Sequence, residues 1–230
     1  VLPLSLGLET RGGLFTKIIE RNSTIPLRNS LTFTTVVDHQ SSVEIHILQG
    51  EREISSGNRS LGKFELVGIP AAPRGVPQIE VSFEVDANGI VSVSATDKAT
   101  GREQQMRITP TSGLSPDEIE RIIAEAATSI ESDRTERERV DLQNKLVSLV
   151  KNTKRSFLEF GGLLSKEGQE AGDQLLVDGS AAINSAEIGE VRLALDGIER
   201  LGRQLTAAMM KESEAQADSR TAPEELSESD

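Results

Sequence analysis

The sequence contains no cysteine, tryptophan or tyrosine, and aromatic residues make up only 3% of it. Without cysteine the chain has no disulfide, no thiolate metal site and no cysteine nucleophile, which fits a reducing compartment, so we expect a cytoplasmic location. The start, VLPLSLGLETRGG, lacks a long apolar run, a basic leader and a small-residue cleavage site. We therefore predict neither a signal peptide nor a membrane partner.

Positive charge is also scarce, since the formal net charge is -12. Residues 1–113 carry 11 Lys/Arg and 12 Asp/Glu, whereas residues 114–230 carry 14 and 25, so the halves are near -1 and -11. An acidic chain with so few aromatics lacks the basic surface and stacking side chains that bind nucleic acid. Nucleic acid is therefore not an expected partner, and the two halves are physically different objects.

Motifs for catalysis are absent as well. The only histidines are His39, in a turn-like segment, and His46, on the polar side of an apolar strand, and they do not have metal-ligand spacing. The sequence has no phosphate-binding loop, no nucleophile elbow and no dinucleotide fingerprint. Carboxylate pairs such as Glu51 with Glu53 are better explained by solvation. We predict no catalytic residue, no metal site and no enzyme activity for this chain.

The first half alternates apolar and polar residues with a period of two. In residues 78–86, QIEVSFEVD, every second side chain is apolar, as a half-buried strand requires. The turn DANG follows, and residues 90–95 return as the partner strand of a hairpin. Similar runs span Leu14–Arg21, Leu31–Val37, Val43–Leu48, Lys63–Val67 and Gln104–Thr109. Short strands at this spacing predict an antiparallel β-sandwich.

The period changes at Ser115. The run Ser115-Pro116-Asp117-Glu118 combines a helix N-cap, a proline suited to the first turn and a glutamate placed for a capping box. Helical periodicity then continues to residue 130, from about Asp133 to Phe160, from about Asp173 to Asn184, and from Glu187 to Lys211. These helices predict a small bundle. The segment from Glu212 has almost no apolar content, which predicts disorder.

The sequence thus predicts an α+β protein in two parts, an antiparallel β-sandwich followed by an α-helical lid or bundle. The expected boundaries are 1–113 for the sandwich, 114–211 for the helices and 212–230 for a disordered acidic tail.

Five stretches resemble a known family: PLSLGLET, NSTIP, SVEIHILQGER, APRGVPQIEVSFEVDANGI and SGLSPDEI. They are similar to the substrate-binding region of the DnaK-type, seventy-kilodalton heat-shock chaperones. The similarity is continuous over about residues 1–135. Beyond that, only the pattern and the length of the helices are similar. It implies a sandwich that holds extended apolar peptides of unfolded proteins under a helical lid. The absence of a terminal EEVD favours a bacterial member.

The resemblance also implies the site residues. Transferred position by position, the peptide-binding residues are Leu8, Thr10, Phe33, Thr34, Gln40, Ser42, Val43, Ile45 and Ile79. Without the resemblance, Phe33, Ile45 and Ile79 would be interpreted as ordinary sandwich core.

At two further sites, this sequence departs from the pattern of the family. The pair that arches over the peptide falls on Arg11 and Val36, and Arg11 stands where Met or Ala is usual, so we expect cationic peptides to be disfavoured. The sandwich arginine of the lid latch is Arg74, but its aspartate partner is replaced by Val147. Asp141 and Glu138 remain candidates to replace that aspartate, and we expect faster release of the bound peptide.

The resemblance places ATP and Mg in an upstream ATPase domain outside this sequence, and no cofactor is expected within it. J-domain and nucleotide-exchange co-chaperones are the partners that it implies for the intact protein. Three alternatives stay open: a structural module that self-associates through its helices, a remote carboxylate hydrolase, and a specialised iron–sulfur assembly chaperone. The run Arg74–Ile79 favours the general-purpose branch over the last of these.

Overall fold

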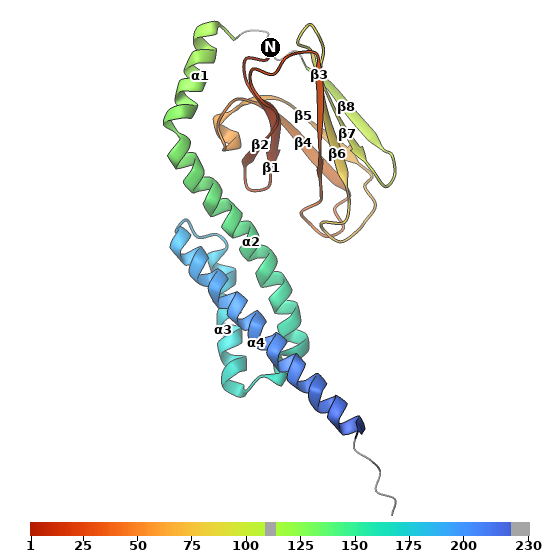
Figure 1. Ribbon diagram of the computed structural model, residues 1–230, viewed down its shortest axis with the longest axis vertical. Coiled ribbons are helices and arrows are strands. Elements are labelled where there is room, and N and C mark those ends of the chain that lie inside the picture. The colour runs from red at the N-terminus through yellow and green to blue at the C-terminus, as the bar shows by residue number, and fades with distance from the viewer. Residues whose placement is uncertain (109–113, 222–230) are drawn as a thin grey trace, which may run out of the picture. The chain divides into compact units, whose positions relative to one another are not determined.

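The computed structural model describes residues 1–108 and 114–221 (Figure 1). The chain divides into two compact units, the first spanning Val1–Glu138 and the second beginning at Arg139. The predicted domain boundary at residue 113 lies outside the described residues, so it stays a prediction.

The first unit contains two antiparallel four-stranded sheets, which confirms the predicted sandwich (Figure 1). One sheet has the strand order β2-β1-β4-β5 and the other β3-β6-β7-β8. The strands are β1 (Leu6–Thr10), β2 (Leu14–Ile19), β3 (Leu27–Phe33), β4 (Ser42–Gln49), β5 (Arg59–Val67), β6 (Ile79–Val85), β7 (Val91–Asp97) and β8 (Glu103–Ile108). A short 3₁₀ turn, η1 (Ser55–Gly57), precedes β5.

The β6–β7 hairpin shows why the period of two specifies this fold. Val81 and Phe83 on β6 pair in register with Ala95 and Val93 on β7, and all four side chains are fully buried between the sheets. At the turn, the Asp86 carboxylate accepts hydrogen bonds from the backbone N–H groups of residues 88 and 90. The alternation and the turn together fix which face of each strand enters the core.

Three strands differ from the sequence-based prediction. Strand β5, expected from Lys63, begins four residues earlier at Arg59. Strand β1 is not among the predicted runs, because Gly7 interrupts its apolar pattern; a Cβ at Gly7 would collide with the backbone of Thr16 on β2, so only glycine fits there. Strand β3 was expected over Leu31–Val37, but it begins at Leu27 and ends at Phe33. Its pairing with β6 ends at Phe33 and Ile79, and the chain then leaves the sheet. Residue 109, the predicted end of the last strand, lies outside the described residues.

The first unit also contains helix α1 (Pro116–Thr128) and the start of α2 (Ile130–Phe160). The predicted capping box is confirmed, because the Ser115 hydroxyl accepts from the Glu118 backbone N–H while the Glu118 side chain accepts from the Ser115 N–H. The hydrogen bonds that the Ser115 backbone N–H and hydroxyl donate to the Glu118 carboxylate lower its pKa. Helix α2 begins at Ile130 rather than near Asp133, since only Ser129 separates it from α1.

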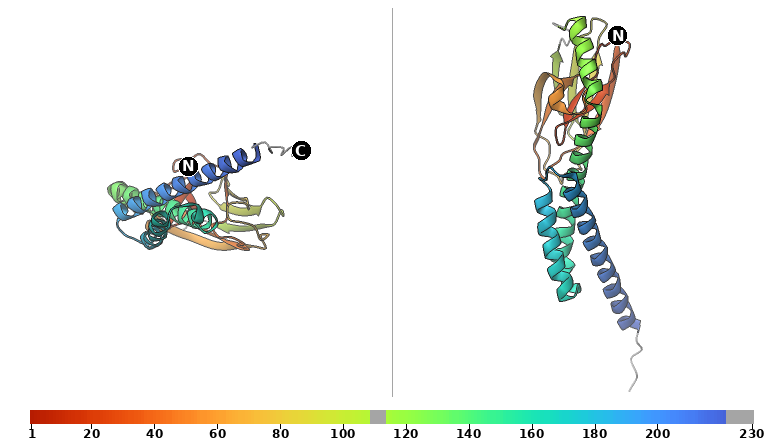
Figure 2. Two further views of the ribbon diagram at one scale, coloured as in Figure 1. Left: turned by 90° about the horizontal axis from the view of Figure 1, so that it is seen from below. Right: turned by 90° about the vertical axis from the view of Figure 1, so that its left-hand side faces the viewer.

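In the second unit, the rest of α2 packs with α3 (Lys166–Ala182) and α4 (Ile188–Thr221) into a helical bundle (Figure 2). A 3₁₀ turn, η2 (Gly161–Leu163), links α2 to α3. The core is aliphatic and includes Leu146, Val150, Leu176, Val191, Leu195, Ile198, Leu201 and Leu205. The predicted bundle is therefore present.

Helix α3 begins about two turns before the expected start near Asp173. Its N-cap is Ser165, whose hydroxyl accepts from the Gly168 N–H at 3.2 Å. Gly168 and Gly172 obscure the apolar period in the sequence. Gly172 has a packing role, because a Cβ there would overlap the ring of Phe157 on α2. Small residues on α3 therefore allow close approach between helices.

Helix α4 continues to Thr221, past the predicted lid end at residue 211 and into the segment predicted as disordered. Residues 212–221 contain glutamate, alanine and glutamine, which propagate a helix even without an apolar stripe. Residues 222–230 of the predicted tail lie outside the described residues. Within the described part of the chain, no helix combines the length and the apolar content needed to span a bilayer.

Candidate peptide-binding groove

The candidate site lies where β1 and β4 separate. Their backbone pairing covers Leu6–Leu8 on β1 and ends at the pair Leu8 and Ile47. On their other sides, β1 pairs with β2 as far as Thr10, and β4 pairs with β5 as far as Ser42. Both strands therefore continue beyond the point at which they part, and the core is open between them.

This opening forms a groove with a volume of about 590 Å³. Its residues come from β1, β3, β4, β6 and two loops: Leu8, Glu9, Thr10, Arg11, Thr32, Phe33, Thr34, Val36, Gln40, Val43, Glu44, Ile45 and Ile79. Leu8, Ile45 and Ile79 also belong to the buried core of the sandwich, and Phe33 and Val43 pack against that core while partly exposed. The groove is thus an apolar opening into the core.

The structure brings together nearly all of the groove residues named from the sequence. Every predicted peptide-contacting residue except Ser42, together with Arg11 and Val36, lines this one groove. Ser42 is adjacent, since its carbonyl accepts a hydrogen bond from Gln40 Nε2 at 2.8 Å. Glu9, Thr32 and Glu44 also line the groove and were not named, because nothing in their local sequence separates them from solvent-facing strand residues.

The loop between β3 and β4 forms one wall of the groove. Gln40 organises this loop, because its Oε1 accepts from the backbone N–H groups of Val36 and Val37 at 3.3 and 3.4 Å. The loop is also tied to the segment after β5, through the His39 N–H donating to the Ala72 carbonyl at 2.8 Å. The wall is therefore a hydrogen-bonded unit rather than an isolated loop.

The β1–β2 turn places Arg11 at the groove. Gly12 and Gly13 have φ values of 87° and 74°, the left-handed region that glycine tolerates, and the Gly13 N–H donates to the Thr10 carbonyl at 3.1 Å. Below the turn, the Thr10 and Thr16 hydroxyls share a hydrogen bond of 3.1 Å. The predicted latch residue Arg74 lies elsewhere, in the loop after β5, where its backbone N–H donates to the Asp38 carboxylate at 3.0 Å.

The turn after β4, which ends the stretch IHILQGER, holds the start of α2. Arg52 donates through Nε and Nη2 to the two carboxylate oxygens of Asp133, both at 2.6 Å, and the Glu53 N–H adds a third hydrogen bond at 3.2 Å. The Arg52 hydrogen bonds lower the pKa of Asp133, and Asp133 in turn raises the pKa of Arg52. Sequence reasoning missed this pair because its members lie 81 positions apart.

Glu51 in the same turn binds the start of the sandwich. Its carboxylate accepts from the Ser5 N–H and from Lys17 Nζ, both at 2.8 Å. Burial raises the pKa of Glu51, but the hydrogen bonds from Lys17 and Ser5 outweigh that effect and leave the pKa lowered. The two carboxylates, Glu51 and Asp133, are thus held ionised as structural contacts.

Among the described residues, no group of three or more His, Asp or Glu side chains is arranged to hold a metal ion. The groove brings together apolar side chains, hydroxyls, an amide, one arginine and the two carboxylates of Glu9 and Glu44. Such a set can bind an apolar ligand and offer it hydrogen bonds.

The fold and the groove define a class of proteins in which a β-sandwich with an apolar opening is joined to a helical bundle. A comparison with protein families identifies the family: the model of the Hsp70 protein family matches residues 1–211. Because this match covers most of the chain, the protein belongs to the Hsp70 family, and its membership supports a chaperone function.

Proposed function

We propose that this chain is the substrate-binding region of a DnaK-type chaperone and that it holds extended apolar segments of unfolded proteins. The observation that carries this proposal is the groove at the parting of β1 and β4, which exposes the core residues Leu8, Ile45 and Ile79 to an incoming side chain. Burying one Leu or Ile side chain contributes about 1.5–3 kcal/mol.

The parted strands also suit an extended backbone. Beyond Leu8 and Ile47, the facing edges of β1 and β4 no longer pair with each other. An extended guest chain could use such edges for backbone hydrogen bonds, which supply affinity without reading side chains. Broad selection of apolar segments, with one pocket for one side chain, follows from this arrangement.

The proposal extends to the intact protein. We infer a bacterial, cytoplasmic chaperone in which an upstream domain binds ATP and Mg and hydrolyses ATP, while the helical bundle serves as the lid. J-domain and nucleotide-exchange co-chaperones would drive that cycle. The chain described here would itself be non-enzymatic.

Fluorescence anisotropy of a labelled Leu-rich heptapeptide tests the proposal. We expect micromolar binding, about -8 kcal/mol, that is lost when the central Leu of the peptide is changed to Asp. Val43→Phe should fill the groove and abolish binding, whereas Val67→Phe, at an exposed position of β5, should preserve it. Equal binding by both variants would place the peptide elsewhere.

Arg11 gives the groove a feature of its own. Arg11 lines the groove, whose other charged members are Glu9 and Glu44. A lysine beside the central Leu of the peptide should be repelled by Arg11, and binding should weaken by up to about fivefold, the size of an exposed charge interaction. Arg11→Met should remove this penalty while the affinity for the neutral peptide stays similar. If the lysine peptide binds as well as the neutral one to both proteins, Arg11 has no part in selection.

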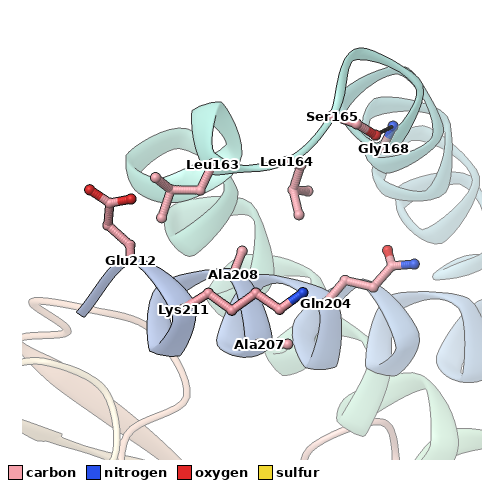
Figure 3. A pocket seen from close by; sticks show the side chains of 9 residues that line it. All are labelled: Leu163, Leu164, Ser165, Gly168, Gln204, Ala207, Ala208, Lys211 and Glu212. Atoms are coloured by element: carbon pink, nitrogen blue, oxygen red, sulfur yellow. Dashed lines mark hydrogen bonds between the residues drawn. The ribbon is translucent and has the colours of Figure 1, made fainter. Parts of the chain in front are cut away.

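Self-association through the bundle is a second candidate function. Figure 3 shows a hollow between Leu163 and Leu164 on one side and Ala207, Ala208 and Lys211 of α4 on the other, with a volume of about 450 Å³. A second hollow of about 640 Å³, which includes Met209 and Met210, adjoins α4 as well. Met210 is 62% exposed and Leu158 is 78% exposed. A second copy of the chain could cover this apolar surface.

Sedimentation velocity tests self-association. The mass should rise with protein concentration, and Met210→Glu should restore the monomer. A monomeric wild-type chain at every concentration would exclude this function and would leave the peptide-binding proposal unaffected.

A further inference from the structure

The outer face of the sheet β2-β1-β4-β5 carries a side-chain bridge beside the groove. The alternation along β4 points Ile45 and Ile47 into the core and His46 away from it. His46 Nδ1 lies 2.5 Å from Glu9 Oε2, and His46 Nε2 lies 2.8 Å from Ser60 Oγ. One imidazole ring therefore links β1, β4 and β5.

The bridge spans the place where the strands part. Glu9 follows Leu8, the last residue of β1 that pairs with β4, and His46 precedes Ile47, the partner of Leu8. Leu8 and Ile45, the neighbours of Glu9 and His46 along the chain, line the groove, and Glu9 itself also lines it. The Glu9–His46 contact is therefore a side-chain link between β1 and β4, at the point where their backbone pairing ends.

We propose that His46 is a positioning residue, which sets the separation of β1 and β4 at the groove and makes peptide release depend on pH. This inference rests on the proposed peptide-binding function and adds a regulation of the same site. It assigns a role to a histidine that is not among the residues lining the groove.

The chemistry of the two ring nitrogens gives the direction. A carboxylate can only accept, so Nδ1–H donates to Glu9 in both charge states, and Nε2 either donates to Ser60 or accepts from its hydroxyl. Both hydrogen bonds thus survive deprotonation, but the imidazolium form adds an ion pair with Glu9. The Glu9 carboxylate makes its hydrogen bond charge-assisted in both states, so protonation of the ring adds only the attraction between opposite charges, which is modest for a partly exposed pair. At acidic pH this contact should therefore hold β1 and β4 together more tightly and slow the release of the peptide.

Other charged groups on this face come from β4 and β5. Lys63 is the cross-strand partner of His46, and its Nζ binds Glu44 Oε1 at 3.0 Å. Glu65 pairs in register with Glu44, and Arg59, beside Ser60 on β5, is a second cation, so these two strands carry two carboxylates and two cations. On the β2 side of Glu9, the register partner is the uncharged Phe15. Charged groups of both signs therefore lie on the strands around the Glu9–His46 contact.

The test is the rate of release of the labelled heptapeptide, measured by stopped-flow competition from about pH 5.5 to about pH 8, the range in which histidines change charge. We expect the release rate of the wild type to rise by up to about fivefold across this range, the size of one partly exposed ion pair. His46→Gln, which keeps a hydrogen-bonding side chain but cannot titrate, should release the peptide at a rate independent of pH. Glu9→Gln should flatten the profile in the same way.

The chain offers a matched control, because its only other histidine is His39. His39 lies in the loop beside the groove with φ 59°, a conformation that asparagine also adopts, so His39→Asn should fold normally and keep the wild-type profile. A pH profile that persists in His46→Gln and disappears in His39→Asn would overturn the inference. A wild-type profile that is already flat would overturn it as well. Absence of peptide binding at every pH would instead refute the proposed function.

Discussion

Charged side chains have different roles in the two compact units. In the first unit, Asp133 and Glu51 have side chains only 5% and 9% exposed, and each is fixed by a cationic partner and a backbone N–H. In the second unit, the pair Lys145 and Glu199 is also short, 2.9 Å, but the lysine is 61% exposed. Nearly buried pairs fix the packing of elements, whereas exposed pairs contribute little to stability.

This difference concerns charge and not the apolar cores, so core truncations should be costly in both units. Phe83→Ala in the sandwich and Leu146→Ala in the bundle remove fully buried side chains, and we expect losses in unfolding free energy of about 3–5 and about 2–5 kcal/mol. Urea unfolding, monitored by amide hydrogen exchange in each unit, measures both losses. Leu31→Ala, at a partly exposed position of β3, is the control and should cost less. If Leu146→Ala cost little stability, the two units would differ in their apolar cores as well as in their charged pairs.

Removing the buried carboxylate should give the next largest effect. Asp133→Asn leaves Arg52 without its bidentate partner, and because Arg52 is partly exposed we expect a loss of about 2 kcal/mol, below the full cost of breaking a buried pair. Hydrogen exchange should show the loss at the start of α2. Glu120→Gln, an exposed change on α1, should have no measurable effect. If both variants unfold alike, the Arg52–Asp133 pair does not hold the helix.

Acid should weaken the first unit through the same groups. The pKa values of Asp133 and Glu51 are lowered in the folded protein, so their contribution is fully present above the ordinary carboxyl pKa, about 4, and is lost as the pH falls through the lowered values. Urea midpoints measured from neutral pH down to about pH 3 should therefore fall, and they should fall less in a Glu51→Gln, Asp133→Asn double variant. An identical acid slope in that variant would contradict this assignment.

The smallest effect is expected for the exposed pair in the bundle. Glu199 has a lowered pKa because Lys145 donates a hydrogen bond to it, yet Lys145→Met should change stability very little, because exposed pairs contribute little. Thermal unfolding of the second unit measures this change. A loss as large as that of Asp133→Asn would remove the contrast between the two units.

Local sequence rules account for much of the fold. The β6–β7 hairpin and the capping box at Ser115 follow from residues close together in the chain, so both could be predicted. Strand β1 and the start of α3 could not, because Gly7 and Gly172 are present for close packing against Thr16 and Phe157, which lie outside their own elements. A glycine required by a distant neighbour resembles a breaker when only the local pattern is considered.

The candidate site shows more clearly what local sequence rules cannot predict. The period of two assigns Ile45 and Ile79 to the core, and the structure agrees, because both are buried. Only the end of the β1–β4 pairing at Leu8 and Ile47 turns part of that core into a groove, and this depends on strand register rather than on residue type. The groove residues were therefore named from the family resemblance. The pairs Arg52–Asp133 and Glu9–His46 join strands and helices far apart in the sequence and were not foreseen.

The central claim is that one apolar side chain of an extended peptide enters the sandwich between β1 and β4. The most direct measurement is a set of intermolecular NOEs between the central Leu of the bound heptapeptide and the methyl groups of the methyl-labelled protein. We predict contacts from that leucine to Leu8, Ile45 and Ile79. NOEs confined to bundle methyls such as those of Leu158 or Leu193, with none to the groove, would contradict the account.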